Sequence, residues 1–577
     1  MKDRNPHPVV FDVECYPNYF LVAFKNPANN KLLKVDVRES SKGLTLEQQK
    51  KLRTAMCTRT TFGYNSNGYD IPMILAALEG LNCEKLKALS DRIVKSDLHQ
   101  WQALKKLDLQ LDPRFNTFDL MQVAPGVFTS LKLYGGRLHS KKLQDLPYDP
   151  SIELTDEQMD HVSEYCENDL DTTIDLYNQL LEDMELRKYM SAEYGLDLRS
   201  KGGAQIAEAI VQSKLKVKAN KDTPPRNVGY TAPDYIKFDS SHLNEILDFV
   251  NKHRFTVDKS GYVKLPTKLI KPFEIGQTTY KCGLGGLHSQ EKELHVENVV
   301  DSDVVSYYPS IMINNDISPP SLGRNFLPFF TSVFNQRILA KKAGEKMRSN
   351  SLKLIINSSF GKLSNRWSCM YHPAGMLEVT LTGQLALLML IESLEKAGCR
   401  VYSANTDGVV HDPGYEHLLE QWEKTTSFEL EHTPYKSLHC RDVNNYVAIK
   451  PDGSVKTKGV FARPGLTKNP ATPIIYDAVV KRLSDGTPVE KTIRECGDIR
   501  EFLTVRTVKG GAEWKGEKLG KVVRFYWSTD GEKIVYSSNG NKVPTSDGST
   551  PLMSLPDATP NNIDYDRYIK EARSILS

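Results

Sequence analysis

The sequence predicts a multi-domain α/β protein. The chain has 577 residues, more than one hydrophobic core usually organises, so several packed domains are expected. Hydrophobic residues make up 40% and charged residues 25% of the chain, as in ordinary globular proteins. Strand-like apolar runs and longer helix-like stretches occur along the whole chain, which indicates a mixture of sheets and helices.

The first elements follow from local signals. Residues 9–13 and 20–24 are expected to form two strands joined by a turn. A helix should begin at Thr155, because Gln158 three residues later completes a capping box. The helix is expected to run to about Met190, with room for one break.

Later elements are predicted in the same way. A glycine-rich loop at 283–286 precedes a strand at 299–305. Residues 400–411 should form a hairpin that turns at 405–408. A strand is expected at 521–527. Helices are expected over residues 329–348, 352–363, 383–397 and 565–575, with a polar break between the first two at Ser349 and Asn350.

Bulk composition restricts the class of protein without defining it. The formal net charge is only +3, and the basic runs at 337–353 and 506–524 are, each taken alone, more typical of solvated faces. The nine cysteines include no C-x-x-C pair, so neither a zinc site nor a disulfide framework is indicated, and a reducing compartment is expected.

Membrane association is not predicted. Residues 1–10 lack the apolar centre of a signal peptide. The longest apolar stretch, residues 385–391, is too short to span a bilayer and is interpreted as part of a buried helix.

Three acidic signatures follow one another in the first third of the chain. They are Asp12-Val13-Glu14, Asn65-Ser66-Asn67-Gly68-Tyr69-Asp70 and Tyr165-Cys166-Glu167-Asn168-Asp169. Residues two apart on a strand share one face, and residues four apart on a helix do the same. Metal-dependent phosphodiester hydrolysis needs several converging carboxylates, and Mg²⁺ prefers such oxygen ligands. Each signature alone is more typical of surface acids, a turn or a core tyrosine; the ordered set favours a nuclease.

Three further signatures occupy the middle of the chain. They are Asp303-Val304-Val305-Ser306-Tyr307-Tyr308-Pro309-Ser310, Lys353-Leu354-Ile355-Ile356-Asn357-Ser358-Ser359-Phe360-Gly361 and Tyr402-Ser403-Ala404-Asn405-Thr406-Asp407-Gly408. The first places a carboxylate near the end of an apolar strand, before a turn at Pro309. Taken singly they could be a capped turn, a solvated helix lysine and a hairpin turn. Taken jointly, these simple readings are less favoured than one shared functional site.

The six motifs, in this order, resemble those of family B DNA polymerases with a DEDD 3′→5′ exonuclease, of the compact bacteriophage type. The resemblance implies an α+β palm with fingers and thumb, and an RNase H-like exonuclease domain. The implied segments are an exonuclease at 1–190, a linker and palm approach at 191–290, a palm at 291–324 and 365–465, fingers at 325–364 and a thumb at 466–577.

The resemblance also implies residue roles at a trimming site. Tyr165 would orient the attacking water. The metal-binding acids would be Asp12, Glu14, Asp70 and Asp169. The contacts with the single-stranded 3′ end would be Asn65, Ser130 and Leu131.

At the implied synthesis site, Asp303 and Asp407 would hold two Mg²⁺ ions, with Mn²⁺ able to substitute. Tyr308 would pack under the deoxyribose and exclude a 2′-hydroxyl. The implied nucleotide-binding residues are Arg337, Lys341, Lys353, Asn357 and Gly361, with Lys353 on the phosphates. The implied DNA-binding residues are Gly285, Gly286, Tyr446 and Lys458.

The chain departs from the family pattern at several positions. Asn405 stands where the third polymerase motif has its first aspartate, which could alter metal affinity. Phe360 replaces a tyrosine, Gly283 replaces the tyrosine of a linker motif, and residues 444–446 lack the lysine of a K-x-Y motif. The basic loop at 509–521 is expected to contact duplex DNA.

The expected partners are primer-template DNA and dNTPs, with processivity, helicase or single-strand-binding proteins as further candidates. The chain lacks the large insertions of protein-primed relatives, so a nucleic-acid primer and no terminal protein is expected. A monomer in the cytoplasm of an infected bacterial host is implied. The alternatives are a nuclease with a degenerate polymerase half, a single-strand-binding module, and a primase or RNA polymerase.

Overall fold

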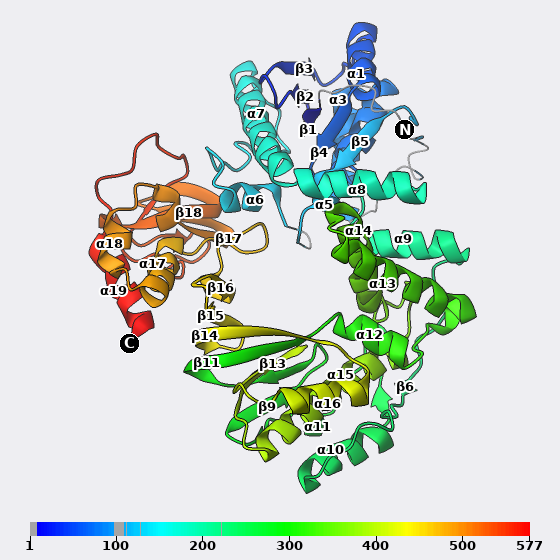
Figure 1. Ribbon diagram of the computed structural model, residues 1–577. Helices are drawn as coiled ribbons and strands as arrows, with labels where there is room; N and C mark the ends of the chain where they lie inside the picture. The colour runs from blue at the N-terminus through cyan, green and yellow to red at the C-terminus, as the bar shows by residue number, and fades with distance from the viewer. Residues whose placement is uncertain (1–7, 97–104, 106–108, 111, 127–128, 221) are drawn as a thin grey trace. The chain divides into compact units, whose positions relative to one another are not determined.

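The computed structural model describes residues 8–96, 105, 109–110, 112–126, 129–220 and 222–577 (Figure 1). Most of the N-terminal segment considered above for a signal peptide, residues 1–7, lies outside these ranges. The chain divides into two compact units. The first unit contains residues up to 202 together with 463–482 and 487–577, and the second contains 203–462 and 483–486. The architecture is the predicted multi-domain α/β class, with several sheets among many helices.

The N-terminal part of the first unit is built on a five-stranded sheet with the order β3-β2-β1-β4-β5. Its strands are β1 (Val9–Tyr16), β2 (Tyr19–Lys25), β3 (Leu32–Val37), β4 (Thr60–Gly63) and β5 (Asn116–Asp119). The first three pair antiparallel, whereas β4 and β5 run parallel to β1. The predicted hairpin at 9–24 is confirmed.

Helices cover both faces of this sheet. They are α1 (Leu46–Thr58), α2 (Asp70–Leu78), α3 (Cys83–Ser96), α5 (Leu120–Val123), α6 (Leu131–Arg137), α7 (Asp156–Gln179) and α8 (Leu181–Tyr194). Alternate β1 residues enter two different cores: Phe11 packs with α2 and α3, and Val10 packs with α7. The capping box of Thr155 and Gln158 is present, and the predicted break falls at Leu180.

The C-terminal part of the first unit forms a separate four-stranded sheet, in the order β19-β17-β18-β20. Its elements are α17 (Pro473–Asp485), α18 (Val489–Arg494), η3 (Ile499–Phe502), β17 (Thr504–Trp514), β18 (Glu517–Glu532), β19 (Val535–Tyr536), β20 (Ser549–Pro551) and α19 (Tyr565–Leu576). The predicted strand at 521–527 lies inside β18, and the last helix is confirmed.

The second unit is built on a nine-stranded sheet in the order β16-β15-β14-β11-β13-β12-β10-β9-β8. The strands are β8 (Phe273–Ile275), β9 (Thr278–Cys282), β10 (Leu287–Ser289), β11 (Lys292–Val304), β12 (Val401–Asn405), β13 (Gly408–His411), β14 (Leu430–Asp442), β15 (Asn445–Ile449) and β16 (Val455–Lys458). The predicted hairpin at 400–411 is confirmed as β12 and β13. A short pair, β6 (Asn227–Val228) and β7 (Phe255–Thr256), stands apart from this sheet.

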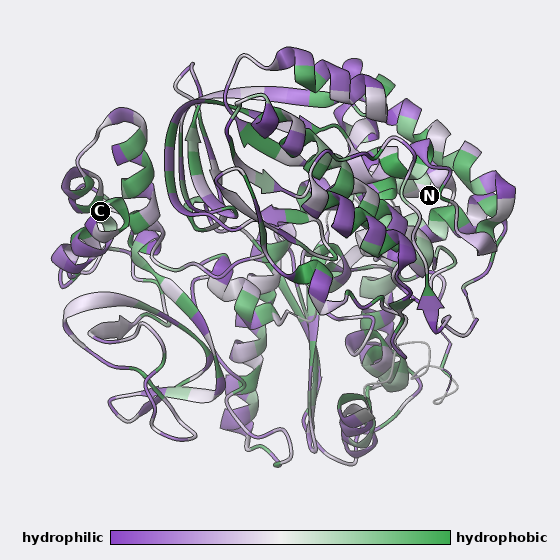
Figure 2. Ribbon diagram, turned by 90° about the horizontal axis from the view of Figure 1, so that it is seen from below, coloured by the Kyte–Doolittle hydropathy of each residue, from purple (hydrophilic) through white to green (hydrophobic). Residues whose placement is uncertain are grey.

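Helices and short turns complete the second unit. They are α9 (Gly203–Leu215), α10 (Ser241–Lys252), α11 (Thr267–Ile270), α12 (Tyr307–Asn314), η1 (Pro320–Asn325), α13 (Phe326–Lys342), α14 (Lys346–Lys362), α15 (Pro373–Lys396), α16 (Glu416–Thr426) and η2 (Gly459–Phe461). Helix α15 packs on strands β8, β10, β12 and β13. Figure 2 shows green and purple segments on the same helices, as expected when one face is buried and the other is exposed.

Two predicted boundaries were wrong. The break between the two basic helices lies at residues 343–345, where Gly344 has a φ of 71°, and not at Ser349 and Asn350, which are inside α14. A left-handed residue ends a helix more effectively than a polar pair. Pro309 does not make a turn: it lies in the first turn of α12, where proline is tolerated because the N–H groups of that turn have no intrahelical acceptor.

Two elements are longer than predicted. Strand β11 begins at Lys292 because its polar first half pairs with β14, and α15 begins at Pro373. Among the described residues, α15 is the one helix with the length and composition to cross a membrane, but 78% of its most apolar window is buried inside the protein. It is therefore placed as a core helix, as predicted for residues 385–391.

Candidate active sites

Two carboxylates that are far apart in sequence meet at one end of the large sheet. Asp303 is the penultimate residue of β11 and pairs across the strands with Gly408. The Val304 amide donates a hydrogen bond of 2.7 Å to the carbonyl of Asp407. A Cβ on Gly408 would lie 1.9 Å from Oδ1 of Asp303. Glycine is thus required here for the Asp303 carboxylate to lie across the hairpin beside Asp407.

The electrostatics of this pair suit a bound cation. Burial, together with the negative charges of Asp301 and Asp407, raises the pKa of Asp303 to about 6. Burial also raises the pKa of Asp407. Two carboxylates that destabilise each other's charge would be stabilised by divalent cations with oxygen ligands. Asp303 and Asp407 therefore fit the predicted Mg²⁺ site, in which they would be the protein ligands.

A cavity of about 240 Å³ opens beside these carboxylates. Tyr446 and Lys458 line it from paired positions on β15 and β16, and the Lys458 ammonium lies 5.9 Å from the centre of the Tyr446 ring. Both predicted DNA-binding residues are thus brought to the carboxylate site.

Sequence reasoning missed a polar triad in the same cavity. The Asp301 carboxylate accepts hydrogen bonds from the Tyr435 hydroxyl at 2.7 Å and from Lys456 at 3.2 Å, and Lys456 also donates to Tyr435 at 3.0 Å. The three residues come from three different strands, so only the register of the sheet brings them together. Lys456 thereby lines the same cavity as Asp303 and Asp407.

A second cavity, of about 380 Å³, reaches Asp407 from the helical side. It is lined by the predicted nucleotide-binding residues Tyr308, Arg337 and Asn357, together with Phe360. The Tyr308 and Phe360 rings lie 4.4 Å apart. Arg337 donates a hydrogen bond of 2.7 Å to the Ser306 hydroxyl, which holds the guanidinium toward this cavity.

Three predicted nucleotide-binding residues do not line either cavity. Lys353 and Gly361 are exposed on α14, and a Cβ on Gly361 would meet no atom within 4 Å. The Lys341 ammonium lies 4.0 Å from Oε2 of Glu431 and is largely exposed. The Lys353 side chain can meet a ligand from solvent, but the lining of the cavity is formed by Arg337 and Asn357.

The glycine-rich loop supports the carboxylate hairpin. Gly286 has a φ of 147°, and a Cβ there would lie 2.9 Å from the Cα of Thr406. The Thr406 amide donates to the Leu287 carbonyl at 2.8 Å. The Tyr308 hydroxyl donates to the Gly285 carbonyl. Gly286 is therefore also needed for close packing of backbone against the hairpin, whereas a Cβ on Gly285 would meet no atom within 4 Å.

Asn405, the substituted position of the third motif, lines the same cavity as Asp407. Its side-chain amide donates to the Val443 carbonyl at 3.2 Å. A carboxylate could not make this donation, so the asparagine has a structural reason here.

The first unit contains a second carboxylate cluster. Asp12 and Glu14 project from β1, Asp70 begins α2 and Asp169 lies on α7. Burial raises the pKa of all four acids, to about 7 for Asp70 and to about 6 for Asp169. The charges of Asp70, Glu14 and Asp169 each raise the pKa of Asp12 further, so the predicted acids do converge.

The cluster has the character of a site for hard cations. Oδ1 of Asp70 is buried and has no hydrogen-bond partner among the described residues. Ligand atoms of Asp12, Glu14 and Cys166 lie within 4.8 Å of one another. Burial raises the pKa of the Cys166 thiol well above its ordinary value, so the thiol stays protonated and the carboxylate oxygens are the better ligands. The set fits Mg²⁺, which Asp12, Glu14, Asp70 and Asp169 would hold.

Tyr165 lies at the edge of this cluster. Its hydroxyl forms a hydrogen bond with Asp169, and burial raises its pKa. The hydroxyl therefore remains protonated at neutral pH and can donate to or orient a water. Its position four residues before Asp169 on α7 is the one predicted.

The predicted 3′-end contacts have structural roles as well. The Ser130 hydroxyl caps α6 by accepting from the Leu133 amide at 3.3 Å. Leu131 packs at the margin of a core. Asn65 is exposed and has a φ of 55°, a conformation that asparagine tolerates better than most residues.

Asp119 supports the Asn65 loop and was not predicted. Its carboxylate accepts hydrogen bonds from the amides of Asn65 at 2.9 Å and Asn67 at 3.1 Å. Asp119 stands at the end of β5, which pairs parallel with β4. This position at a strand end is the sequence feature that could have identified it. The loop that leads into Asp70 is thus fixed by a buried acid.

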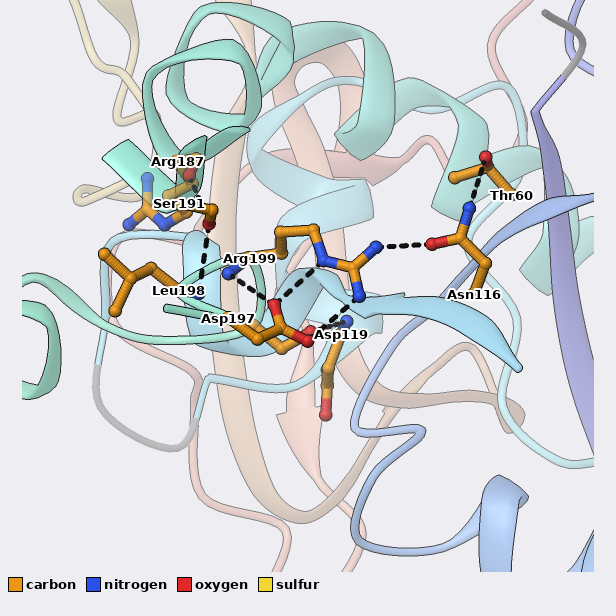
Figure 3. A network of polar contacts seen from close by, with 9 residues as sticks. Thr60, Asn116, Asp119, Arg187, Ser191, Asp197, Leu198 and Arg199 are labelled. Carbon is orange, nitrogen blue, oxygen red and sulfur yellow. Dashed lines mark hydrogen bonds and ion pairs between the residues drawn. The ribbon is translucent and has the colours of Figure 1, made fainter. Parts of the chain in front are cut away.

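The end of β5 is fixed in turn by the segment after α8. Figure 3 shows this network, in which Arg199 bonds to Asn116 and to Asp197. The Asp119 amide donates to the Ser200 hydroxyl at 2.9 Å. Support for the carboxylate cluster therefore extends to residue 200.

Asp70→Asn is expected to stabilise the metal-free protein at pH 8. The folded-state pKa of Asp70, about 7, exceeds the ordinary value of 3.8. The folded chain therefore binds more protons than the unfolded chain between those values, and the free energy of unfolding falls as pH rises through this window. Removing the charge should add about 1–3 kcal/mol at pH 8 and little at pH 4.

Thermal unfolding in EDTA at both pH values measures this effect. Asp171→Asn, which removes an exposed acid on the same helix as Asp169, is the control and should change little. A lower unfolding temperature for Asp70→Asn at pH 8 would contradict the prediction.

Comparison with known proteins finds similarity to solved structures. No family model and no curated protein matches the chain. One similar solved structure is the family B DNA polymerase from the hyperthermophilic archaeon Pyrobaculum calidifontis, with 15% sequence identity and a TM-score of 0.42. The similarity covers 99% of this chain and 77% of that protein.

Proposed function

We propose that this chain is a template-directed DNA polymerase of family B with an intrinsic 3′→5′ proofreading exonuclease, of the compact bacteriophage type. The observation that supports this most strongly is the separation of the acids into two clusters. Asp303 and Asp407 meet in one unit, and Asp12, Glu14, Asp70 and Asp169 meet in the other. Six ordered motifs thus supply one carboxylate site for synthesis and one for trimming.

At the synthesis site, the chain's residues position a nucleotide beside the primer end. Arg337 would bind the triphosphate and Asn357 would contact the nucleotide in the same cavity. Bound metal ions would lower the pKa of the primer 3′-hydroxyl and neutralise the triphosphate. Lys456 and Lys458 would contact the negatively charged primer strand from the adjoining cavity.

At the trimming site, Tyr165 would orient a water toward the terminal phosphodiester. The four acids would hold the metal ions that activate it. Asn65, Ser130 and Leu131 would contact the frayed 3′ end. Primer-template DNA and dNTPs would then be the substrates of the whole chain.

Primer extension tests the proposal. The purified chain with Mg²⁺ and four dNTPs is expected to extend a 5′-labelled primer only when a template is annealed. Without dNTPs it should degrade the primer from its 3′ end. Terminal addition that ignores the template, or no extension at all, would contradict the proposal, and degradation alone would favour the nuclease reading.

Substitution of Tyr308 should separate DNA from RNA synthesis. Tyr308→Val removes the ring that would lie under the sugar, so discrimination against NTPs is expected to fall by about 10- to 200-fold, the range for a pocket that loses steric contact. Tyr308→Phe keeps the ring and loses only the hydrogen bond to Gly285, and should retain discrimination. Single-nucleotide incorporation with dNTP and NTP measures the ratio; equal ratios in Tyr308→Val and the unchanged chain would contradict the role.

Biological context follows from the same proposal. A nucleic-acid primer is proposed, because the chain from Asp303 to Asp407 has no large insertion of the kind that protein-primed relatives carry. It contains helices α12 to α15 and strand β12, with η1 between α12 and α13. Replication of viral DNA in the cytoplasm of a bacterial host, by a monomer without a terminal protein, is the setting that the resemblance suggests. Processivity, helicase and single-strand-binding partners are further candidates.

A further inference from the structure

A lysine outside the predicted site lies against the trimming cluster. Lys132, on α6, places its ammonium 4.8 Å from the centre of the Tyr165 ring, a distance typical of a cation–π contact. Its positive charge partly offsets the rise that burial causes in the pKa of both Glu14 and Asp169. Lys132 therefore faces the water-orienting tyrosine and two of the four acids together.

Asp145 holds this lysine from the other side. Its Oδ1 lies 3.6 Å from the Lys132 ammonium, and its Oδ2 accepts a hydrogen bond of 2.9 Å from the amide of Lys521, on β18. Gly520 has a φ of 94°, and a Cβ there would lie 2.9 Å from the Asp145 carboxylate. The first half of β18 is thus shaped to receive this carboxylate.

The segment that contains Asp145 is fixed to the C-terminal sheet by further contacts. The Leu143 amide donates to the Met553 carbonyl at 2.7 Å, and the Leu555 amide donates to the Lys141 carbonyl at 2.8 Å. The fully buried Arg524 donates to the Ser140 carbonyl at 2.9 Å. Residues 140–145 therefore cannot shift without disturbing the C-terminal sheet.

We propose that Asp145 is a positioning residue of the trimming site: anchored on β18, it holds Lys132 against Tyr165. The C-terminal sheet would then support exonuclease activity without touching the substrate's reacting atoms. This inference rests on the proposed exonuclease function and deepens it. The path runs from the Lys521 amide through the Asp145 carboxylate and the Lys132 ammonium to the ring of Tyr165.

The path explains why a charge is needed at position 145. An asparagine would still accept from the Lys521 amide, but it would not hold an ammonium ion by charge. Lys132 is about one quarter exposed, so without Asp145 its flexible side chain can turn into solvent. Loss of supporting groups around metal sites typically costs about 10- to 100-fold in activity.

The test compares Asp145→Asn with the unchanged chain on single-stranded DNA in Mg²⁺. The exonuclease kcat is expected to fall about 10-fold, with KM changed less than about twofold and primer extension unchanged. Lys132→Met should show a similar loss, and Lys132→Arg should restore most of the activity. The double variant Asp145→Asn with Lys132→Met should be no slower than Lys132→Met alone, because both changes remove one interaction.

A matched control is available in the same interface. The Lys141 and Asp557 side chains form an ion pair of 2.6 Å between the same two segments, and both are exposed. Asp557→Asn should leave the exonuclease rate unchanged. Gly520→Ala, which would displace the carboxylate of Asp145, should reproduce the loss caused by Asp145→Asn.

Two results would overturn the inference. One is an Asp145→Asn rate equal to that of the unchanged chain. The other is a double variant whose losses multiply, since independent effects would show that Asp145 does not act through Lys132. Failure of the proposed function gives a different result, because the unchanged chain itself would then leave the 3′ end intact.

Discussion

A chain in which Asp407 is replaced by alanine is expected to extend a primer about 10³-fold more slowly than the unchanged chain. Asp407 lies in the turn of the β12–β13 hairpin and lines the same cavity as Asp303. Its removal would leave Asp303 as the one proposed metal ligand at that site. Several kcal/mol of charge stabilisation would be lost, and each 1.4 kcal/mol corresponds to about tenfold in rate. Single-turnover incorporation of one dNTP measures the effect.

Trimming provides the internal control for this substitution. The acids proposed to carry out trimming lie in the other unit, so the Asp407→Ala chain should degrade single-stranded DNA at the rate of the unchanged chain. Extension that stays within about tenfold of the unchanged rate would show that Asp407 is not a metal ligand.

The paired substitution Asp12→Ala with Glu14→Ala is expected to lower 3′→5′ degradation by at least about 10³-fold. Both carboxylates project from one face of β1 into the cluster with Asp70 and Asp169. Their loss would remove half of the acids proposed to hold metal, at a cost of several kcal/mol in transition-state stabilisation. Release of nucleotides from a 3′-labelled single strand measures the rate.

Glu167→Ala is the matched control for the paired substitution. Glu167 lies on α7 two residues before Asp169, but it faces outward and pairs with Lys34 at 2.5 Å. Its removal should leave trimming unchanged. Primer extension by the Asp12→Ala, Glu14→Ala chain should persist and should accumulate more mismatches, and a normal trimming rate in that chain would contradict the assignment of the acids.

Local signals were enough to predict several elements that position these sites. The capping box at Thr155 and Gln158 and the hairpin turn at 406–407 depend on neighbouring residues alone. The convergence of Asp12 with Glu14 follows from strand periodicity. In each case the interaction closes over a few residues, so the sequence contains the whole signal.

Features that depend on long-range pairing were not predictable in this way. The triad of Asp301, Tyr435 and Lys456 exists because β11, β14 and β16 lie in one sheet in a particular register. Likewise, Asp145 meets Lys521 because the C-terminal sheet packs on residues almost 400 positions earlier. No local pattern encodes either contact.

The positions of the helices were predicted better than the residues by which they line a cavity. Residues 353, 357 and 361 do share one side of α14, yet Asn357 lines the cavity beside Asp407 and Lys353 does not. The spacing shows which residues share a face; it does not show how far along the helix the neighbouring cavity reaches. That limit depends on how α13 and α14 pack around Gly344.

Anomalous diffraction from crystals grown with Mn²⁺, a primer-template and an unreactive dNTP analogue tests the existence of two metal centres most directly. The expected result is one group of peaks within about 2.5 Å of the Asp303 and Asp407 oxygens, and a separate group at Asp12, Glu14, Asp70 and Asp169. Density at only one of these clusters, or ions bound elsewhere while both clusters stay empty, would contradict the proposal.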